Sequence, residues 1–186
     1  MNVYESCPVF ENETYLLRLV EDRDVDDLLK VYSDEKAVPF FNGDNCHGDD
    51  FHYTTRERMQ QAVAFWKEAY QNGWFVRWVI VDKRTGEAIG TIENFHRDAD
   101  DFFANCALLR LDLRSDYETA DEIVSILSPA LVPSFQIFGC DKIASKAIPA
   151  ATERRKAFER LGFTASPHKL VGSDGTQYGD YFVLFK

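Results

Sequence analysis

The sequence predicts a mixed α/β domain built on one central sheet. Three observations carry this prediction: short segments with strand-like alternation, longer segments with apolar residues at helical spacing, and a strand followed by a charged amphipathic helix near the C-terminus. That last unit covers residues 142–148 and 152–163 and ends in Leu-Gly-Phe, where Gly162 suits the positive φ of a helix C-cap. The predicted order of elements is β-α-α-β-β-β-α-β-α-β-β.

Composition limits the class of protein. A chain of 186 residues with 45% hydrophobic residues can bury one globular core, so we expect residues 1–186 to form a single domain. The net charge of −10 argues against a nucleic-acid partner, because phosphate binding needs a basic surface. No CxxC pair, signal-peptide pattern or membrane-length apolar run is found, so we expect a cytoplasmic protein without membrane contact.

The N-terminal half is predicted to hold a strand, two helices and a β-hairpin. Thr54 and Glu57 form a capping-box pattern at the start of the second helix. Three tryptophans, Trp66, Trp74 and Trp78, fit core packing. The predicted segments are, in order, strand 15–20, helix 24–33, a second helix that ends at Gly73, and the hairpin strands 74–81 and 88–92.

The C-terminal half is predicted to alternate strands with helices. Strand 105–113 alternates leucine with charged residues. The helix that follows, from about 118 to 127, is expected to break or kink near Pro129 and Pro133, because proline lacks the N–H that a helix needs. After the Leu-Gly-Phe unit, the last predicted strands are 170–171 and 181–185.

The order and spacing of these elements resemble the GNAT superfamily of N-acetyltransferases over nearly the whole chain. The local features are a hairpin at 86–90 similar to the family's G-x-x-I-G, the apolar strand and helix at 111–127, and the strand-helix-Leu-Gly-Phe unit. The resemblance is strongest to the branch that acts on ribosomal-protein N-termini and small amines. It implies a mixed, largely antiparallel twisted sheet of about seven strands, with about four helices on both faces and a V-shaped cofactor cleft.

The resemblance also implies an acetyl-CoA-dependent N-acetyltransferase. Acetyl would pass to a primary amine, on a small molecule or a protein N-terminus, by direct attack in a ternary complex. The cofactor's pantetheine would pair with the strand backbone around Leu111 and Leu113. Its pyrophosphate would bind the N-terminus of the following helix, where free N–H groups and the helix dipole attract anions.

The predicted pyrophosphate loop departs from the family's pattern, Q/R-x-x-G-x-G/A. In the register anchored on Tyr117, Glu118 replaces Arg or Gln, and Asp121 and Ile123 replace the two glycines. A second register, anchored on Arg114, restores no glycine either. A Cβ at a glycine site blocks close backbone approach, and a carboxylate about 4 Å from a phosphate costs about 1–4 kcal/mol.

Two later positions also depart from the family. Ala151 stands where the family often has Asn, and Phe158 stands where it often has the Tyr that protonates the leaving thiolate. The alternative for Phe158 is a plain core residue, and the alternative for Asp121 and Glu122 is first-turn helix acids that face water. The positions expected at the cofactor by resemblance are Leu111, Leu113, Glu118, Thr119, Ala120, Asp121, Glu122, Ile123, Ala151 and Phe158.

Glu93 and His96 are the candidate catalytic residues. Acyl transfer to an amine needs a base for the ammonium proton, and both residues stand at the predicted end of the third strand, beside the expected cleft. The alternative for each is a solvated residue of a strand end. Asp112 is a weaker candidate, because strand alternation can turn it away from the cleft.

The resemblance implies that the acidic loop 42–50 walls the acceptor pocket, where Asp44 would attract a cationic amine, and the alternative is a plain solvated loop. Tyr178 and Asp180 are further candidates for substrate binding, and a turn into an edge strand explains them equally well. The loop also holds Cys46 and His47, but their spacing matches no standard metal site, so no metal is expected.

These departures leave a second function open: a GNAT-fold binding or regulatory module that has lost acetyl-CoA catalysis. An open cleft with free backbone N–H groups at 118–123 would support the enzyme, and a cleft filled by side chains would support the module. The sequence does not name the acceptor, and edge strands at the C-terminus leave a homodimer open.

Overall fold

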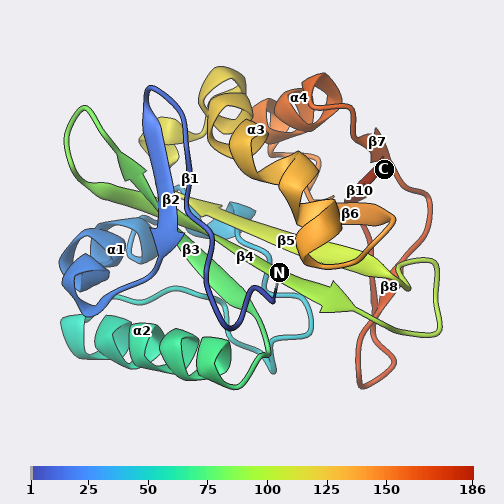
Figure 1. The fold of residues 1–186 in the computed structure, drawn as a ribbon, viewed down its shortest axis with the longest axis horizontal. Coiled ribbons are helices and arrows are strands. Elements are labelled where there is room, and N and C mark those ends of the chain that lie inside the picture. Colours follow the sequence, from blue (N-terminus) through green and yellow to red (C-terminus); the bar gives the residue numbers. More distant parts are fainter. Residues whose placement is uncertain (1) are drawn as a thin grey trace.

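An eight-stranded sheet forms the centre of the computed structural model, which describes residues 2–186 (Figure 1). The strand order is β1-β2-β3-β4-β5-β6-β10-β7, and all neighbours are antiparallel except β5 and β6. Two short strands, β8 and β9, pair separately. The strands are β1 (Phe10–Glu11), β2 (Tyr15–Leu19), β3 (Val76–Asp82), β4 (Ala88–Arg97), β5 (Cys106–Leu113), β6 (Lys142–Lys146), β7 (Thr164–Ala165), β8 (Leu170–Val171), β9 (Gln177–Tyr178) and β10 (Tyr181–Phe185).

Four α-helices cover the two faces of the sheet, as Figure 1 shows: α1 and α2 lie on one face, and α3 and α4 on the other. This arrangement confirms the predicted GNAT-like α/β fold. The helices are α1 (Val25–Tyr32), α2 (Arg56–Gln71), α3 (Ala120–Ile137) and α4 (Thr152–Arg160).

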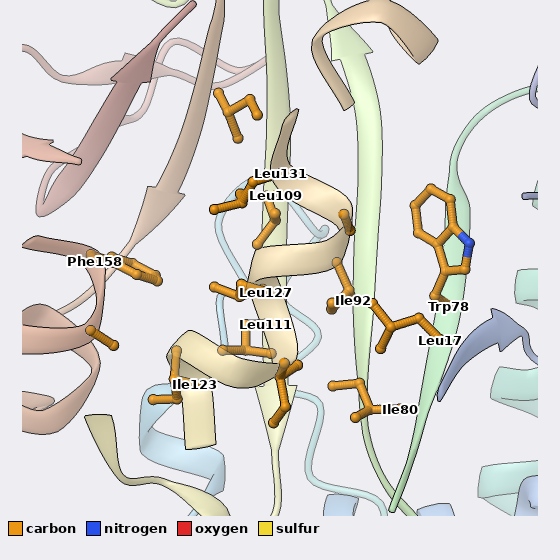
Figure 2. Close-up of a cluster of buried hydrophobic side chains, with 14 of the residues drawn as sticks. Leu17, Trp78, Ile80, Ile92, Leu109, Leu111, Ile123, Leu127, Leu131 and Phe158 are labelled. Carbon is orange, nitrogen blue, oxygen red and sulfur yellow. The ribbon is translucent and has the colours of Figure 1, made fainter. Parts of the chain in front are cut away.

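Buried apolar side chains form three clusters on the sheet, the smallest of them around Phe103 and Tyr181. The largest lies under α3 and α4, where Leu111 of β5 packs with Ile123 and Leu127 of α3 (Figure 2). The second core joins α1 and α2 to the opposite face and includes Tyr32 and Trp66. Because side chains alternate along a strand, neighbouring residues of one strand serve different cores, and each face can hold a different kind of site.

Helix α3 is continuous from Ala120 to Ile137 through both of its prolines, so of the predicted break or kink near Pro129 and Pro133 the break was wrong. A proline frees the carbonyl four residues earlier, which for Pro129 is that of Ser125. The side-chain amide of Asn12 donates to that carbonyl at 2.8 Å. A contact from the N-terminal loop, which no local pattern announces, therefore compensates for one missing helical hydrogen bond.

Two other predictions are corrected by the structure. The N-cap of α2 is Thr55 and not Thr54, because Thr55 has the extended backbone and its hydroxyl accepts from the Arg58 N–H. Trp74 is not a core residue, since 55% of its surface is exposed where it follows the turn at the end of α2. Gly162 has the positive φ, +90°, that the C-cap prediction required.

The parallel pair β5 and β6 positions the candidate site. Their backbone pairing runs from Cys106 opposite Lys142 to Leu109 opposite Ser145 and stops there. Beyond that point β5 continues to Leu113, paired with β4 alone. Because β6 itself ends at Lys146, the edge of β5 at Leu111 and Leu113 has no neighbouring strand on this side, where the predicted V-shaped cleft would lie.

Candidate functional site

The edge of β5 that faces the cleft is closed to solvent. Leu111 and Leu113, the expected pantetheine-binding residues, lie beyond the last pair with β6, and each is only 1% exposed. A cofactor that pairs with a strand needs its backbone N–H and C=O groups free. Something else therefore occupies the position of a ligand along this edge.

The side chain of Arg154, from the first turns of α4, fills that position. Its Nη1 donates to the Leu111 carbonyl at 2.8 Å and to the Phe40 carbonyl at 2.9 Å. Its Nε and Nη2 donate to the two carboxylate oxygens of Glu118, both at 2.8 Å. Each guanidinium nitrogen thus has an acceptor, and the side chains of this ion pair are 2% and 8% exposed. Arg154 and Glu118 together form a plug, called here the Arg154–Glu118 plug.

The N-terminus of α3 is also occupied by the chain itself. Among residues 118–123, all backbone N–H groups except that of Asp121 have an acceptor within residues 2–186. The carboxylate of Glu153 accepts from the Ala120 N–H at 3.2 Å. The hydroxyl of Thr119, the N-cap residue, accepts from the Glu122 N–H at 3.4 Å. A helix N-terminus favours an anion, and here the anion is a carboxylate of α4.

The remaining acidic residues at this helix end are paired as well. Asp121 meets Arg160 of α4 at 2.6 Å, and Glu122 accepts from the Tyr15 hydroxyl. Asp121 is exposed, which fits the alternative of a first-turn acid that faces water. Glu122, the other residue of that alternative, is half-buried, with 30% of its side chain exposed. Glu118 is buried against Arg154.

The residues at the cleft therefore do not fit acetyl-CoA. The strand edge for the pantetheine carries Arg154, and the helix end for the pyrophosphate carries Glu153. Ala151 is buried just before α4. Phe158 stacks on Phe163, with ring centroids 5.2 Å apart, and lies in the largest core, as its alternative interpretation held (Figure 2).

The two candidate bases lie on opposite faces of the sheet. His96 is exposed on the α3 side, where its Nδ1 lies 2.8 Å from the Phe138 carbonyl. Glu93 is buried on the α1–α2 side between Arg77 and Arg110. Burial by itself would raise the pKa of Glu93, but the two guanidinium groups outweigh it and hold the pKa below its ordinary value. An ionised carboxylate held by two arginines is poorly suited to take up a proton.

Glu93 belongs to a ladder of charges across three strands. Arg77 of β3 lies directly opposite Glu93 of β4, which lies directly opposite Arg110 of β5. The fourth member, Asp112, accepts from Arg77 at 3.1 Å and from the Tyr32 hydroxyl at 2.7 Å. Burial raises the pKa of Asp112. Alternation does turn Asp112 away from the cleft, as its weaker ranking assumed.

Of the predicted substrate-binding residues, Asp44 lines a cavity of about 470 Å³ whose charged lining also includes Arg97, Asp98, Asp100, Asp101 and Arg110, whereas Tyr178 and Asp180 do not line it. Asp44 binds the Lys146 ammonium at 2.7 and 2.8 Å and accepts from the Tyr181 hydroxyl at 3.0 Å. Tyr178 lies beside it, with the Lys146 nitrogen 5.9 Å from its ring centroid. Asp180 occupies a turn with φ of +64°. A cation at Asp44 would therefore have to compete with Lys146.

Loop 42–50, which was expected to wall an acceptor pocket, lines a cavity on the α1–α2 side through Asn45, Cys46, His47 and Asp49, and sequence reasoning missed the arginines of that cavity. The cavity has a volume of about 350 Å³ and is lined by three arginines, Arg58, Arg77 and Arg110, together with aromatic residues of α2 and of the preceding loop. The sequence did contain a sign of these buried charges, because Arg77 and Arg110 interrupt the apolar runs of two strands. Within residues 2–186, no three Cys, His, Asp or Glu side chains are grouped as a metal site would need.

Comparisons with known proteins agree with this fold. A family model described as an acetyltransferase (GNAT) domain matches residues 15–164. The structure is similar to ribosomal-protein-S5-alanine acetyltransferase from Vibrio fischeri, with 19% identity, 96% of each chain covered and a TM-score of 0.68. It is also similar to a GNAT-family acetyltransferase from Bacillus anthracis (14% identity, 96% of this chain and 98% of that chain, TM-score 0.69). A search of curated proteins finds no match.

A further similar structure is a ribosomal L7/L12 alpha-N-protein acetyltransferase in complex with coenzyme A. It is 13% identical, with 96% of this chain and 98% of that chain covered and a TM-score of 0.68. Because the family model covers most of the sequence, this chain belongs to the GNAT acetyltransferase family. None of the helices in the described part of the chain has the length and apolar character to cross a membrane.

Proposed function

We propose that this GNAT-family protein is a binding or regulatory module that does not use acetyl-CoA. The observation that carries the proposal is the Arg154–Glu118 plug, which occupies the hydrogen-bonding edge of β5 at Leu111. The carboxylate of Glu153 on the N-terminus of α3 supports it, because that carboxylate holds the place of a bound anion.

The energy needed to open the cleft also supports the proposal. A cofactor would have to expel Arg154 from four hydrogen bonds and leave Glu118 without its partner. Removing one partner of a buried ion pair costs about 3–5 kcal/mol, which lowers an affinity by roughly 200-fold or more.

The second candidate is the family's own activity, transfer of acetyl from acetyl-CoA to a primary amine of a small molecule or protein N-terminus. The unpaired edge of β5 after Leu109 favours it, because a cofactor's pantetheine would pair with that edge. For this function, Arg154 would have to leave that edge when acetyl-CoA arrives.

Calorimetric titration with acetyl-CoA and with CoA distinguishes the two candidates. We expect no binding of either ligand at millimolar concentration, in low and in moderate salt. Micromolar binding would contradict the proposed binding or regulatory module and support the acetyltransferase. A screen of amine acceptors would then identify the substrate. Arg160→Gln is the matched control, because it removes an exposed arginine of the same helix and leaves the plug intact.

A further inference from the structure

The solvent-facing side of α3 carries no charge along most of the helix. Residues 123–140 contain no Asp, Glu, Lys or Arg, although these four types make up 28% of the chain. A surface helix of a globular protein usually places charged residues opposite its apolar face. Here the exposed positions are Ser128, Val132 and Gln136, and Val132 is 75% exposed. This side of α3 is therefore uncharged and partly apolar.

An apolar groove runs beside this helix. It has a volume of about 390 Å³ and lies between α3, the end of α4 and the last strand, β10. Apart from Ser128 and Lys186, its lining side chains are apolar. Phe185 of β10 lines the groove and is 58% exposed. Contiguous exposed apolar surface of this kind marks an interaction site.

The sheet has an open edge at the same place. Strand β6 pairs with β10 as far as Phe185, whereas β7, on the other side of β10, pairs only with Phe182 and Val183. On the side away from β6, Phe185 therefore has no neighbouring strand within residues 2–186. An unpaired strand edge is a template for a strand of another chain. The groove and this edge together are called here the α3–β10 surface.

The charge of the chain favours a second copy as the partner of this surface. With a net charge of −10, the chain would attract a cationic partner to its acidic faces and not to an uncharged one. Two copies repel each other through those acidic faces, so they approach with the least repulsion where the surface is uncharged. The neutral α3–β10 surface is therefore better suited to self-association than to a partner that is selected by charge.

The rim of the surface is complementary to itself in charge. Lys186 lies beside Asp141, since its backbone N–H donates to the Asp141 carbonyl at 3.0 Å. The Asp141 side chain is 63% exposed and has a long contact, 3.7 Å, with the Lys142 ammonium. When a patch meets its own copy about a twofold axis, each residue of the patch faces a residue of the same patch. Lysine and aspartate side by side can then face aspartate and lysine.

The surface is complementary to itself in shape as well. It holds a groove and, on its borders, two projecting apolar side chains, Val132 and Phe185. In a twofold dimer, the projecting side chains of each copy can enter the groove of the other. A different protein would need an apolar patch of matching shape, whereas a second copy already has one.

We propose that two copies of this chain associate through the α3–β10 surface about a twofold axis. The proposal goes beyond the function proposed above. It does not depend on whether the cleft admits acetyl-CoA, because Arg154 and Glu118 do not line the groove.

Sedimentation equilibrium of the full chain over a range of concentrations is the test. We expect the mass to rise to twice that of the monomer. Added salt should strengthen the association, because it screens the repulsion between acidic copies and exposed ion pairs at the rim contribute little. A monomer at all concentrations, or association that weakens as salt is raised, would overturn the proposal.

Two variants locate the interface. Val132→Glu and Phe185→Glu each place a charge at an exposed position beside the groove, so the fold should be retained, which circular dichroism and urea unfolding check. A twofold dimer would bury each new charge twice, so the dissociation constant should rise by roughly tenfold or more. Phe65→Glu is the matched control, because Phe65 is a 49% exposed ring of α2 on the opposite face of the sheet.

Phe65→Glu should leave the association unchanged. A dimer that persists in both groove variants would place the interface elsewhere and contradict the proposal. Vesicles of neutral phosphatidylcholine test a lipid surface as the other occupant. Vesicle binding by a monomeric wild type, lost in Val132→Glu, would overturn the proposal in favour of lipid, whereas a dimer that ignores the vesicles and dissociates in Val132→Glu would support it.

Discussion

The two faces of the sheet use buried arginine in different ways. On the α3–α4 face, Arg154 has an acceptor for each nitrogen and closes the gap beside β5. On the α1–α2 face, Arg77 and Arg110 line a cavity and bind Glu93 between them, and the Nε atom of each has no acceptor within the described residues 2–186. The arginine of one face therefore closes a gap beside a strand edge, whereas the arginines of the other hold the buried carboxylates Glu93 and Asp112.

Removal of Arg77 should have the largest effect on stability. Arg77→Met leaves Asp112 without a charged partner and Glu93 with Arg110 alone. Breaking a buried ion pair costs about 3–5 kcal/mol, and two carboxylates are affected here. Urea unfolding should show a loss at the upper end of that range. A loss below about 1 kcal/mol would mean that the ladder on this face is not a structural element.

Removal of Arg154 should have the next largest effect. We expect Arg154→Ala to lower the free energy of unfolding by about 3 kcal/mol, because Glu118 is left buried and unpaired. The double variant Glu118→Gln with Arg154→Met removes both charges and should recover most of that loss. A double-mutant cycle measures the coupling directly. Additive losses would contradict the description of these two residues as one plug.

The ladder should also make the free energy of unfolding depend on pH in the acid range. Because the pKa of Glu93 is lowered, its ion pairs contribute stability that is complete above its ordinary pKa of 4.5 and is lost as the pH falls through the lowered value. Asp112 has a raised pKa and acts in the opposite direction, with stability gained as the pH falls toward its ordinary value of 3.8.

We therefore expect the unfolding free energy of the wild type to fall more steeply below pH 4.5 than that of Glu93→Gln. Urea unfolding at pH 7, 5, 4 and 3 measures both curves. Parallel curves would show that Glu93 is not held ionised by its arginines, and would return it to consideration as a proton acceptor.

The smallest effect is expected at the exposed end of the cleft. Arg160→Gln removes the partner of Asp121, and the two side chains are 51% and 88% exposed. Exposed pairs contribute little, so thermal or urea unfolding should change by less than about 0.5 kcal/mol. A larger change would mean that charge at the mouth of the cleft, and not the buried plug, governs this region.

Local pattern was sufficient to predict much of this fold. Alternation identified the strands, and the charged helix with Gly162 at its end identified α4 and its C-cap. The departures from the family pattern at residues 118–123 were also visible, because they involve residue types at fixed spacing. Each of these depends on neighbours in the chain, which the sequence displays directly.

Whether the cleft beside β5 is open or closed could not be predicted, because it depends on contacts between segments that are distant in the sequence. Arg154 looks like one more basic residue on a charged helix, and only its contact with the Leu111 carbonyl, 43 residues earlier in the chain, makes it a plug. Asn12 supports the proline-containing helix in the same way. The ladder left a detectable signal, since Arg77, Glu93 and Arg110 are charged positions in three consecutive buried strands that pair with one another.

Hydrogen exchange of β5 tests the closed cleft most directly. The backbone amides of residues 110–120 are compared with and without millimolar acetyl-CoA, in the wild type and in the double variant Glu118→Gln with Arg154→Met. The closed cleft predicts unchanged exchange in the wild type, because Arg154 already covers the strand edge at Leu111. New protection of these amides in the wild type on addition of acetyl-CoA would show that the plug opens, and would contradict the account.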